Sequence, residues 1–190
     1  MSETMRRLRE DHFNTSRLLT ALERQVSAME RGDRIDWDIV RRIVEYCLVF
    51  PDLYHHPLED QVFIRLRSKG MLAAAPLADL VEEHRDLSAS LRRVAAAVEQ
   101  VLQDATVPRD WFVSLIRKFL NTQRDHIRRE ELEFYPTAER VLGPADWADL
   151  DKAASRTPVD PLFGSPTERQ YLALLRDIRT EEANEPPGAR

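Results

Sequence analysis

The chain has 190 residues, a length that suits one domain with a hydrophobic core, or one domain with a small appendage. Hydrophobic residues make up 43% of the sequence and charged residues 32%, with only five glycines, a composition typical of a helical globular protein. The net charge of -5 gives no electrostatic reason to expect nucleic acid or an anionic membrane as a partner.

The first predicted helix covers residues 4–31. Apolar residues recur in it in alternating steps of three and four, which is the pattern of the inward face of a helical bundle. Gly32 and Asp33 end the helix, and Asp36 is the expected N-cap of the next one. The inward face consists of Met5, Leu8, His12, Thr15, Leu19, Leu22, Val26 and Met29.

The second predicted helix covers residues 37–68 and carries two prolines in its interior, Pro51 and Pro57. An interior proline removes one backbone hydrogen bond and kinks a helix, at a cost of about 3 kcal/mol or more. We therefore expect a distorted helix around His55 and His56, with a helix split in two as the alternative. The inner stripe consists of Val40, Val44, Leu48, Pro51, His55, Leu58, Glu59, Val62 and Leu66.

Two further long helices are predicted, over residues 76–104 and 108–141, the first of them after a turn at Gly70 and with Pro76 in its first turn. Long helices with short connections predict an all-α, up-down-up-down four-helix bundle. The inward face of the third helix consists of Leu77, Leu80, His84, Leu87, Leu91, Val94, Val98 and Val101. That of the fourth consists of Phe112, Leu115, Phe119, Thr122, His126, Glu130 and Glu133.

The sequence changes character after residue 142. A short helix is predicted over residues 146–155, an irregular connector over 157–166, and a last amphipathic helix over 167–182. We therefore predict a bundle domain over residues 1–142, a C-terminal extension with two additional helices over 143–183, and a disordered tail over 184–190. The apolar side of the last helix consists of Tyr171, Leu172, Leu174, Leu175 and Ile178.

Four of the five histidines lie at mirror-image positions about the predicted turns. In antiparallel helices joined by short loops, positions equidistant from a turn lie at the same height, so one imidazole from each helix is expected at one level. A single histidine on such a face is usually an ordinary core residue. Several buried imidazoles together are costly without a shared partner, and a metal would satisfy them all. The four are His12, His55, His84 and His126.

Carboxylates accompany two of these histidines at the spacing that a metal site needs. Glu59 follows His55 by four residues and Glu130 follows His126 by four, so each pair projects from one helical face. Four imidazoles and two carboxylates are too many ligands for one tetrahedral zinc. They suit two adjacent ions of a metal that accepts both ligand types, with iron as the leading choice.

These residues, over roughly positions 5–141, resemble the hemerythrin-type HHE cation-binding domain. The resemblance is close in residues 50–60, in Glu82-Glu83-His84 and in residues 126–131. It implies a four-helix bundle with a non-haem di-iron centre, often oxo- or hydroxo-bridged, that binds or reacts with dioxygen, peroxide or nitric oxide. By the same resemblance His12, His55, His84 and His126 would be terminal ligands, and Glu59 and Glu130 would bridge.

One departure from the family pattern concerns the third helix, where oxygen-carrying hemerythrins have two histidines one turn apart. Leu80 and Ser88 stand one turn from His84 here, so the site is one imidazole short. His56 is a candidate replacement if the distortion at Pro57 turns it inward, since a helical neighbour of His55 normally points about 100° away.

Three further assignments stay open. Glu131 is an alternative ligand to Glu130. Tyr54 and Tyr135 are either hydrogen-bond donors near the site or ordinary residues at a bundle end. A group of arginines on the fourth helix is expected to be a solvated face, namely Arg124, Arg128 and Arg129.

The leading functional hypothesis is a cytoplasmic di-iron protein that takes a small diatomic or peroxide ligand, whether or not as an enzyme. The alternative is a non-catalytic iron or redox sensor that signals through its C-terminal helices, which could also form a homodimer interface. A ferritin-like ferroxidase would need Glu-x-x-His pairs that the site lacks. Cys47 is the single cysteine, so no intrachain disulfide forms, and we expect a buried, inert thiol. No apolar run approaches the roughly 18 residues needed to span a bilayer.

Overall fold

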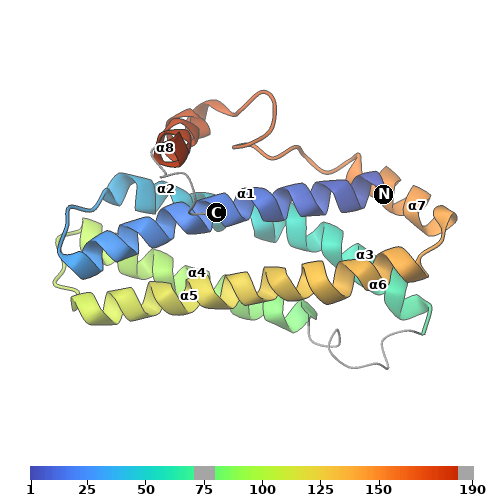
Figure 1. Ribbon diagram of the computed structural model, residues 1–190, viewed down its shortest axis with the longest axis horizontal. Coiled ribbons are helices and arrows are strands. Elements are labelled where there is room, and N and C mark those ends of the chain that lie inside the picture. The colour runs from blue at the N-terminus through green and yellow to red at the C-terminus, as the bar shows by residue number, and fades with distance from the viewer. Residues whose placement is uncertain (71–79, 184–190) are drawn as a thin grey trace.

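The computed structural model describes residues 1–70 and 80–183, with the side chains of residues 80 and 81 excepted (Figure 1). Within these ranges the chain is helical and contains no strand. Four long helical rods alternate in direction, which confirms the predicted bundle. The rods are α1 (Glu3–Arg31); α2, η1 and α3 (Trp37–Cys47, Pro51–His55, His56–Ser68); α4 (Leu80–Leu102); and α5, η3 and α6 (Arg109–Arg129, Glu130–Phe134, Tyr135–Val141).

The first turn of the bundle has the capping chemistry that the sequence predicts. Gly32 ends α1 with φ 77°, a left-handed conformation that glycine adopts without steric cost. The side chain of Asp36 then accepts hydrogen bonds from the backbone N–H groups of Asp38 and Ile39, at 3.0 and 3.1 Å, and so starts α2.

Two apolar clusters fill the bundle. The larger includes Leu19 and Phe50, with Cys47 buried as predicted, and the smaller includes Leu8 and Phe134. Every rod with members in both clusters passes from one to the other near a buried histidine, for example between Leu8 and Leu18 in α1. The polar residues therefore form a layer with apolar packing on both sides.

The second rod is distorted where the sequence places Pro57. Pro57 has no backbone N–H, and the residue before it, His56, donates its N–H to the carbonyl of Pro51, five residues back. The segment Pro51–His55 is accordingly a single π-helical turn, wider than an α-helical one. The predicted distortion lies at the two adjacent histidines, and the rod is also interrupted by a turn at Leu48 and Val49, as the alternative of a split helix expected.

The fourth rod departs from the prediction of a regular helix over residues 108–141. It contains a second π-helical turn, Glu130–Phe134, in which the N–H of Tyr135 reaches the carbonyl of Glu130, and Pro136 follows. The same proline effect operates here as at Pro57, and we did not predict it.

Three residues predicted to face inward are exposed. Thr122 is exposed because the buried face of α5 runs through Ile116, Leu120 and His126 instead. Glu133 is exposed because the π-helical turn brings the residues after it onto the inner face. Leu172 is 53% exposed because it begins its helix away from the side that carries Leu174 and Ile178.

The C-terminal extension packs on the first two rods. Helix α7 (Pro144–Ala154) lies against α1 and α3, and Asp151 accepts hydrogen bonds from the N–H and hydroxyl of Thr4, at 2.8 and 2.7 Å. After the turn η4 (Arg169–Tyr171), helix α8 (Leu172–Ala183) lies against α1 and α2, where Arg42 pairs with Asp177 at 2.8 Å.

Two predictions fall outside the described residues, the start of the third helix over residues 76–79 and the disordered tail over 184–190. Among the helices that the structure does describe, none is long and apolar enough to cross a membrane.

Candidate metal centre

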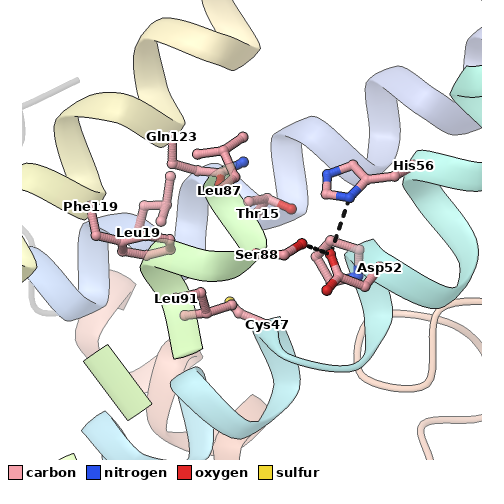
Figure 2. A pocket seen from close by; sticks show the side chains of 11 residues that line it. Thr15, Leu19, Cys47, Asp52, His56, Leu87, Ser88, Leu91, Phe119 and Gln123 are labelled. Atoms are coloured by element: carbon pink, nitrogen blue, oxygen red, sulfur yellow. Dashed lines mark hydrogen bonds and ion pairs between the residues drawn. The ribbon is translucent and has the colours of Figure 1, made fainter. Parts of the chain in front are cut away.

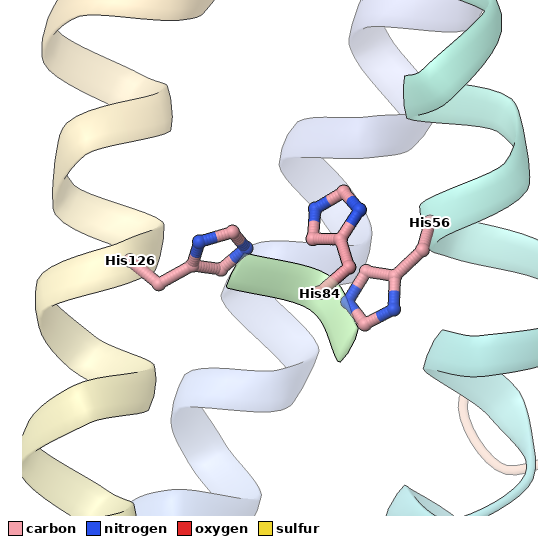
Figure 3. A group of neighbouring side chains, drawn as sticks. All are labelled: His56, His84 and His126. Atoms are coloured by element: carbon pink, nitrogen blue, oxygen red, sulfur yellow. The ribbon is translucent and has the colours of Figure 1, made fainter. Parts of the chain in front are cut away.

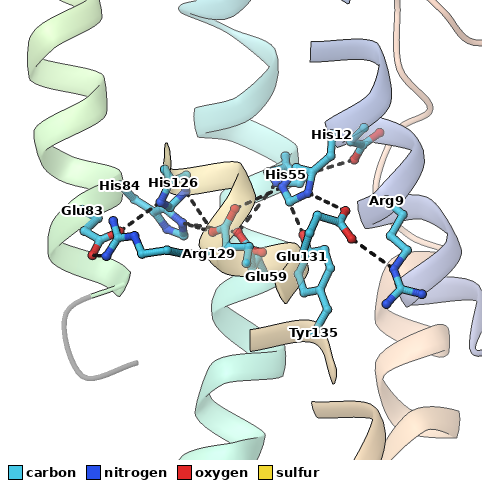
Figure 4. Close-up of polar contacts among 12 residues, drawn as sticks. Arg9, His12, His55, Glu59, Glu83, His84, His126, Arg129, Glu131 and Tyr135 are labelled. Carbon is cyan, nitrogen blue, oxygen red and sulfur yellow. Dashed lines mark hydrogen bonds and ion pairs between the residues drawn. The ribbon is translucent and has the colours of Figure 1, made fainter. Parts of the chain in front are cut away.

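All five histidines are buried in the polar layer, together with the two carboxylates predicted as their partners. Each imidazole is at most 8% exposed, and Glu59 and Glu130 are 0% and 1% exposed. All four rods contribute, so the structure brings together every residue of the predicted set. Five of them, His12, His55, Glu59, His84 and His126, are labelled in Figure 4. The seven are His12, His55, His56, Glu59, His84, His126 and Glu130.

Two groups of donor atoms meet in the centre, and Glu59 belongs to both. Glu130 also reaches both, because its Oε2 lies 3.1 Å from His12 Nε2 and its Oε1 lies 2.9 Å from His126 Nε2. The carboxylates thus lie between two sets of imidazoles, an arrangement that can hold two adjacent cations. The first group is His12, His55 and Glu59, and the second is Glu59, His84, His126 and Glu130, with the donor atoms of each group within 4.8 Å of one another.

His56 points into this centre although it follows His55 directly. Its ring stacks on that of His84, with centroids 4.1 Å apart and planes 11° from parallel, and it forms a further donor group with His84 and His126 (Figure 3). The π-helical turn Pro51–His55 explains this position. Because this turn is wider than an α-helical one, it changes the direction in which the side chain of His56 leaves the helix axis. The imidazole that α4 lacks is therefore supplied from the second rod.

Each of the five imidazoles has a carboxylate next to its Nδ1. Such pairing fixes the orientation of a histidine and leaves Nε2 free for a metal. Sequence reasoning missed four of these carboxylates, because three of them reach a histidine on another helix and the spacing along one helix gives no signal for such contacts. The pairs are His12–Glu131 at 2.9 Å, His126–Glu83 at 3.1 Å, and His55–Asp11, His56–Asp52 and His84–Asp60 at 3.3 Å.

The sequence left open whether Glu130 or Glu131 is the ligand, and the two residues have different positions in the structure. Glu130 lies among the inner donor atoms, whereas Glu131 contacts the outer nitrogen of His12. The prediction of a solvated arginine face is wrong in part. Arg124 is half-buried and pairs with Glu23 at 2.7 Å. Arg129 pairs with Glu83 at 2.6 Å and so supports the contact of that carboxylate to His126, while Arg128 is exposed as expected.

Tyr135 belongs to the centre and Tyr54 does not contact it. The hydroxyl of Tyr135 lies 3.2 Å from His12 Nε2, the two rings are stacked 13° from parallel, and the residue is 0% exposed. Tyr54 is half-buried and packs against Phe50.

A small cavity lies beside His56, towards the larger apolar cluster (Figure 2). Its volume is ≈ 20 Å³, enough for about one water-sized molecule. Ser88, one turn from His84, donates a hydrogen bond of 2.5 Å to Asp52, which in turn contacts His56. The apolar part of the wall consists of Leu19, Cys47, Pro51, Leu87, Leu91 and Phe119.

The polar atoms of this layer fit a bound cation. Both carboxylate oxygens of Glu59, Glu130 Oε2 and His126 Nε2 are buried without a hydrogen bond of acceptable geometry, although oppositely charged atoms lie close by. An unsatisfied buried group costs about 1–3 kcal/mol. Donor atoms that converge without aligning on one another are what a shared cation requires.

In the metal-free chain, protonated histidines supply the positive charge that a cation would otherwise bring to the carboxylates. Burial opposes a charge on His12, but hydrogen bonds to Glu130 and Glu131 outweigh it and raise the pKa of His12 to about 10. Burial likewise opposes a charge on His84, and the nearby carboxylates of Asp60, Glu130 and Glu59 raise its pKa to about 11. Burial lowers the pKa of His55 to about 3. A bound metal would displace the protons of the first two imidazoles.

Comparison with known proteins gives one family. The sequence profile described as "Hemerythrin HHE cation binding domain" matches residues 4–138. No curated protein matches the chain.

Proposed function

The chain belongs to the hemerythrin HHE cation-binding domain family, and on that premise we propose that its bundle holds two iron ions that bind or react with dioxygen, peroxide or nitric oxide. Cation binding follows from the family and the buried His/Glu groups. In the proposed division of the chain, residues 1–142 hold the metal and residues 143–183 cover one side of the bundle. The proposed ligands are His12, His55, His56, Glu59, His84, His126 and Glu130.

One observation carries the proposal: two groups of imidazoles share Glu59, and Glu130 contacts a histidine of each. A single ion cannot use seven donors spread over two groups, and a tetrahedral zinc site would leave several of them unsatisfied. Mixed imidazole and carboxylate ligands suit iron. Bound iron supplies the redox equivalents and the Lewis acidity of the centre.

The residues of the chain supply orientation and exclusion of water. Outer carboxylates such as Glu83 and Asp11 hold the imidazoles so that Nε2 faces inward. The apolar clusters cover both sides of the layer, so water can approach only along its edge, where an open pocket is lined by His56 and His84. The cavity beside His56 has the size and the mostly apolar wall that suit a diatomic molecule.

The two donor groups are unequal. His56 gives the group of His84 and His126 a third imidazole. The other group has two imidazoles, those of His12 and His55, together with carboxylate oxygens. The ion held by His12 and His55 is therefore expected to have more coordination positions left to fill than the other ion, which favours reaction or sensing over a saturated structural site.

Metal analysis and an optical titration test the proposal. Chain produced with ample iron should contain two iron ions per molecule, and azide or nitric oxide should change its charge-transfer spectrum. Removal of the imidazole in His84→Ala should lower the iron content, while Arg128→Ala, on the exposed side of α5, should leave it unchanged. One zinc and no iron in the purified chain would contradict the proposal.

A second candidate function is a non-catalytic iron or redox sensor, with a homodimer through α7 and α8 as one form of output. The observation that favours it is the attachment of the extension to α1, the helix of His12. Arg7 donates hydrogen bonds of 3.0 Å to the carbonyls of Ala154 and Thr157. The loaded and metal-free chains should then differ in hydrogen exchange within α8, or in sedimentation. If the loaded and metal-free chains behave identically in both measurements, the sensor function is contradicted and the reaction with a small oxidant remains as the proposed function.

A further inference from the structure

The two π-helical turns place one aromatic ring each in the polar layer. In the second rod the residue that closes the turn and precedes the proline is His56, before Pro57. In the fourth rod it is Tyr135, before Pro136. Each donates its backbone N–H to the carbonyl five residues back, and each is buried. The same backbone device thus presents an imidazole on one side of the centre and a phenol on the other.

The two rings lie beside different donor groups. His56 belongs with His84 and His126. Tyr135 lies beside the other group, with its hydroxyl 3.2 Å from His12 Nε2 and its ring centroid 5.2 Å from that of His12 (Figure 4). The group of His12, His55 and Glu59 is the one with fewer donors. Tyr135 therefore stands where this group lacks a ligand.

The hydroxyl of Tyr135 is fully buried, lies 3.2 Å from His12 Nε2 and also reaches the carboxylate of Glu59. His12 and Glu59 belong to one donor group, so both neighbours of the hydroxyl are candidate ligands of the same cation. When His12 Nε2 binds that cation, the hydroxyl loses its contact to this nitrogen, and its oxygen already lies beside the metal position.

We propose that Tyr135 is an oxygen ligand of the metal ion held by His12, His55 and Glu59. The proposal rests on the iron centre proposed above and adds a ligand to it. On binding, the metal–oxygen bond forms as the hydroxyl proton leaves to solvent, so one extra proton is released per chain. The other ion keeps imidazoles and carboxylates alone, which makes the two ions chemically distinct.

The test compares the full-length chain with Tyr135→Phe and with the matched control Tyr54→Phe. Tyr54 is adjacent to His55 in sequence but packs on Phe50. Each chain is loaded anaerobically with iron(II) sulfate and oxidised with ferricyanide, and iron content, visible absorption and resonance Raman spectra are recorded. Wild type and Tyr54→Phe should show a phenolate-to-iron(III) charge-transfer band with tyrosine ring modes. Tyr135→Phe should lose both, because it keeps the ring and lacks only the oxygen.

Wild-type spectra decide the matter even if a variant folds poorly, since ring-deuterated tyrosine should shift the enhanced Raman modes. Two iron ions without a phenolate signature in the wild type, or an unchanged signature in Tyr135→Phe, would overturn this assignment and leave the iron centre intact. A wild-type chain that takes up no iron would overturn both.

Discussion

Adjacent glutamates in the fourth rod have different surroundings and should respond differently to substitution. Glu130 contacts nitrogens of both donor groups, while Glu131 contacts the outer nitrogen of His12 and pairs with Arg9. We expect Glu130→Gln to lose at least one metal ion. Glu131→Gln should keep both and bind them about 10- to 100-fold more weakly, the effect typical of removing a carboxylate that orients a ligand. Chelator competition measures both, and equal losses in the two variants would contradict the assignment.

Protonation of the same histidines predicts how the stability of the metal-free chain depends on pH. Below their unfolded pKa of about 6.5 the raised pKa values of His12 and His84 stabilise the fold, and this contribution is lost as the pH rises towards 10 and 11. His55 acts oppositely, because its lowered pKa makes stability fall as the pH drops from about 6.5 towards 3.

The melting temperature of the metal-free chain should therefore pass through a maximum near about pH 6.5 and fall between pH 7 and 9. The loaded chain should not show this fall, since a metal has replaced the two protons. A thermal melt series at fixed ionic strength measures both forms. A melting temperature of the metal-free chain that rises from pH 7 to 9 would contradict the prediction.

At the scale of the helical elements, Pro57 removes a backbone hydrogen bond from the second rod and thereby determines where the proposed ligand His56 lies. With Pro57→Ala an N–H becomes available, and a regular α-helix through residues 51–57 is then favoured. We expect the metal-free variant to be more stable than wild type and the metal affinity to be lower, because His56 would rotate off His84. Pro144→Ala, at the first turn of α7, is the matched control. Unchanged affinity together with higher stability would show that the π-helical turn does not position a ligand.

Periodicity and capping residues predicted the rods, the start of the second at Asp36 and the distortion at Pro57. Those signals are local, and local physics decides them. The second π-helical turn also had a local signal, Pro136, which the continuous pattern of the fourth helix obscured. The outer carboxylates had almost none, since Asp11 reaches His55 on another rod and Glu83 reaches His126. Such contacts depend on the rotation of whole helices, which spacing along one helix does not give.

At the scale of the whole molecule, the buried polar layer makes stability depend on metal. A cation that binds only the folded chain stabilises it by about 2.7 kcal/mol when its free concentration is 100 times Kd. The loaded chain should accordingly melt at a higher temperature than the chelated one. Calorimetry with and without chelator, at equal ionic strength, measures the difference. Equal melting temperatures would mean that the layer tolerates its unsatisfied groups.

The attachment of α7 and α8 to α1, α2 and α3 also bears on how quickly bound metal can leave. Local unfolding occurs most readily in the segments that have the fewest buried contacts with the rest of the protein. Three of the five histidines lie in the rods against which the extension packs, whereas His84 lies on α4 and His126 on α5. We expect iron to be released to a chelator at the rate of amide hydrogen exchange in the first turns of α4. This rate should be higher than the rate of global unfolding. The extension would then act as a kinetic selector, holding one half of the bundle closed so that metal exchange is confined to the other.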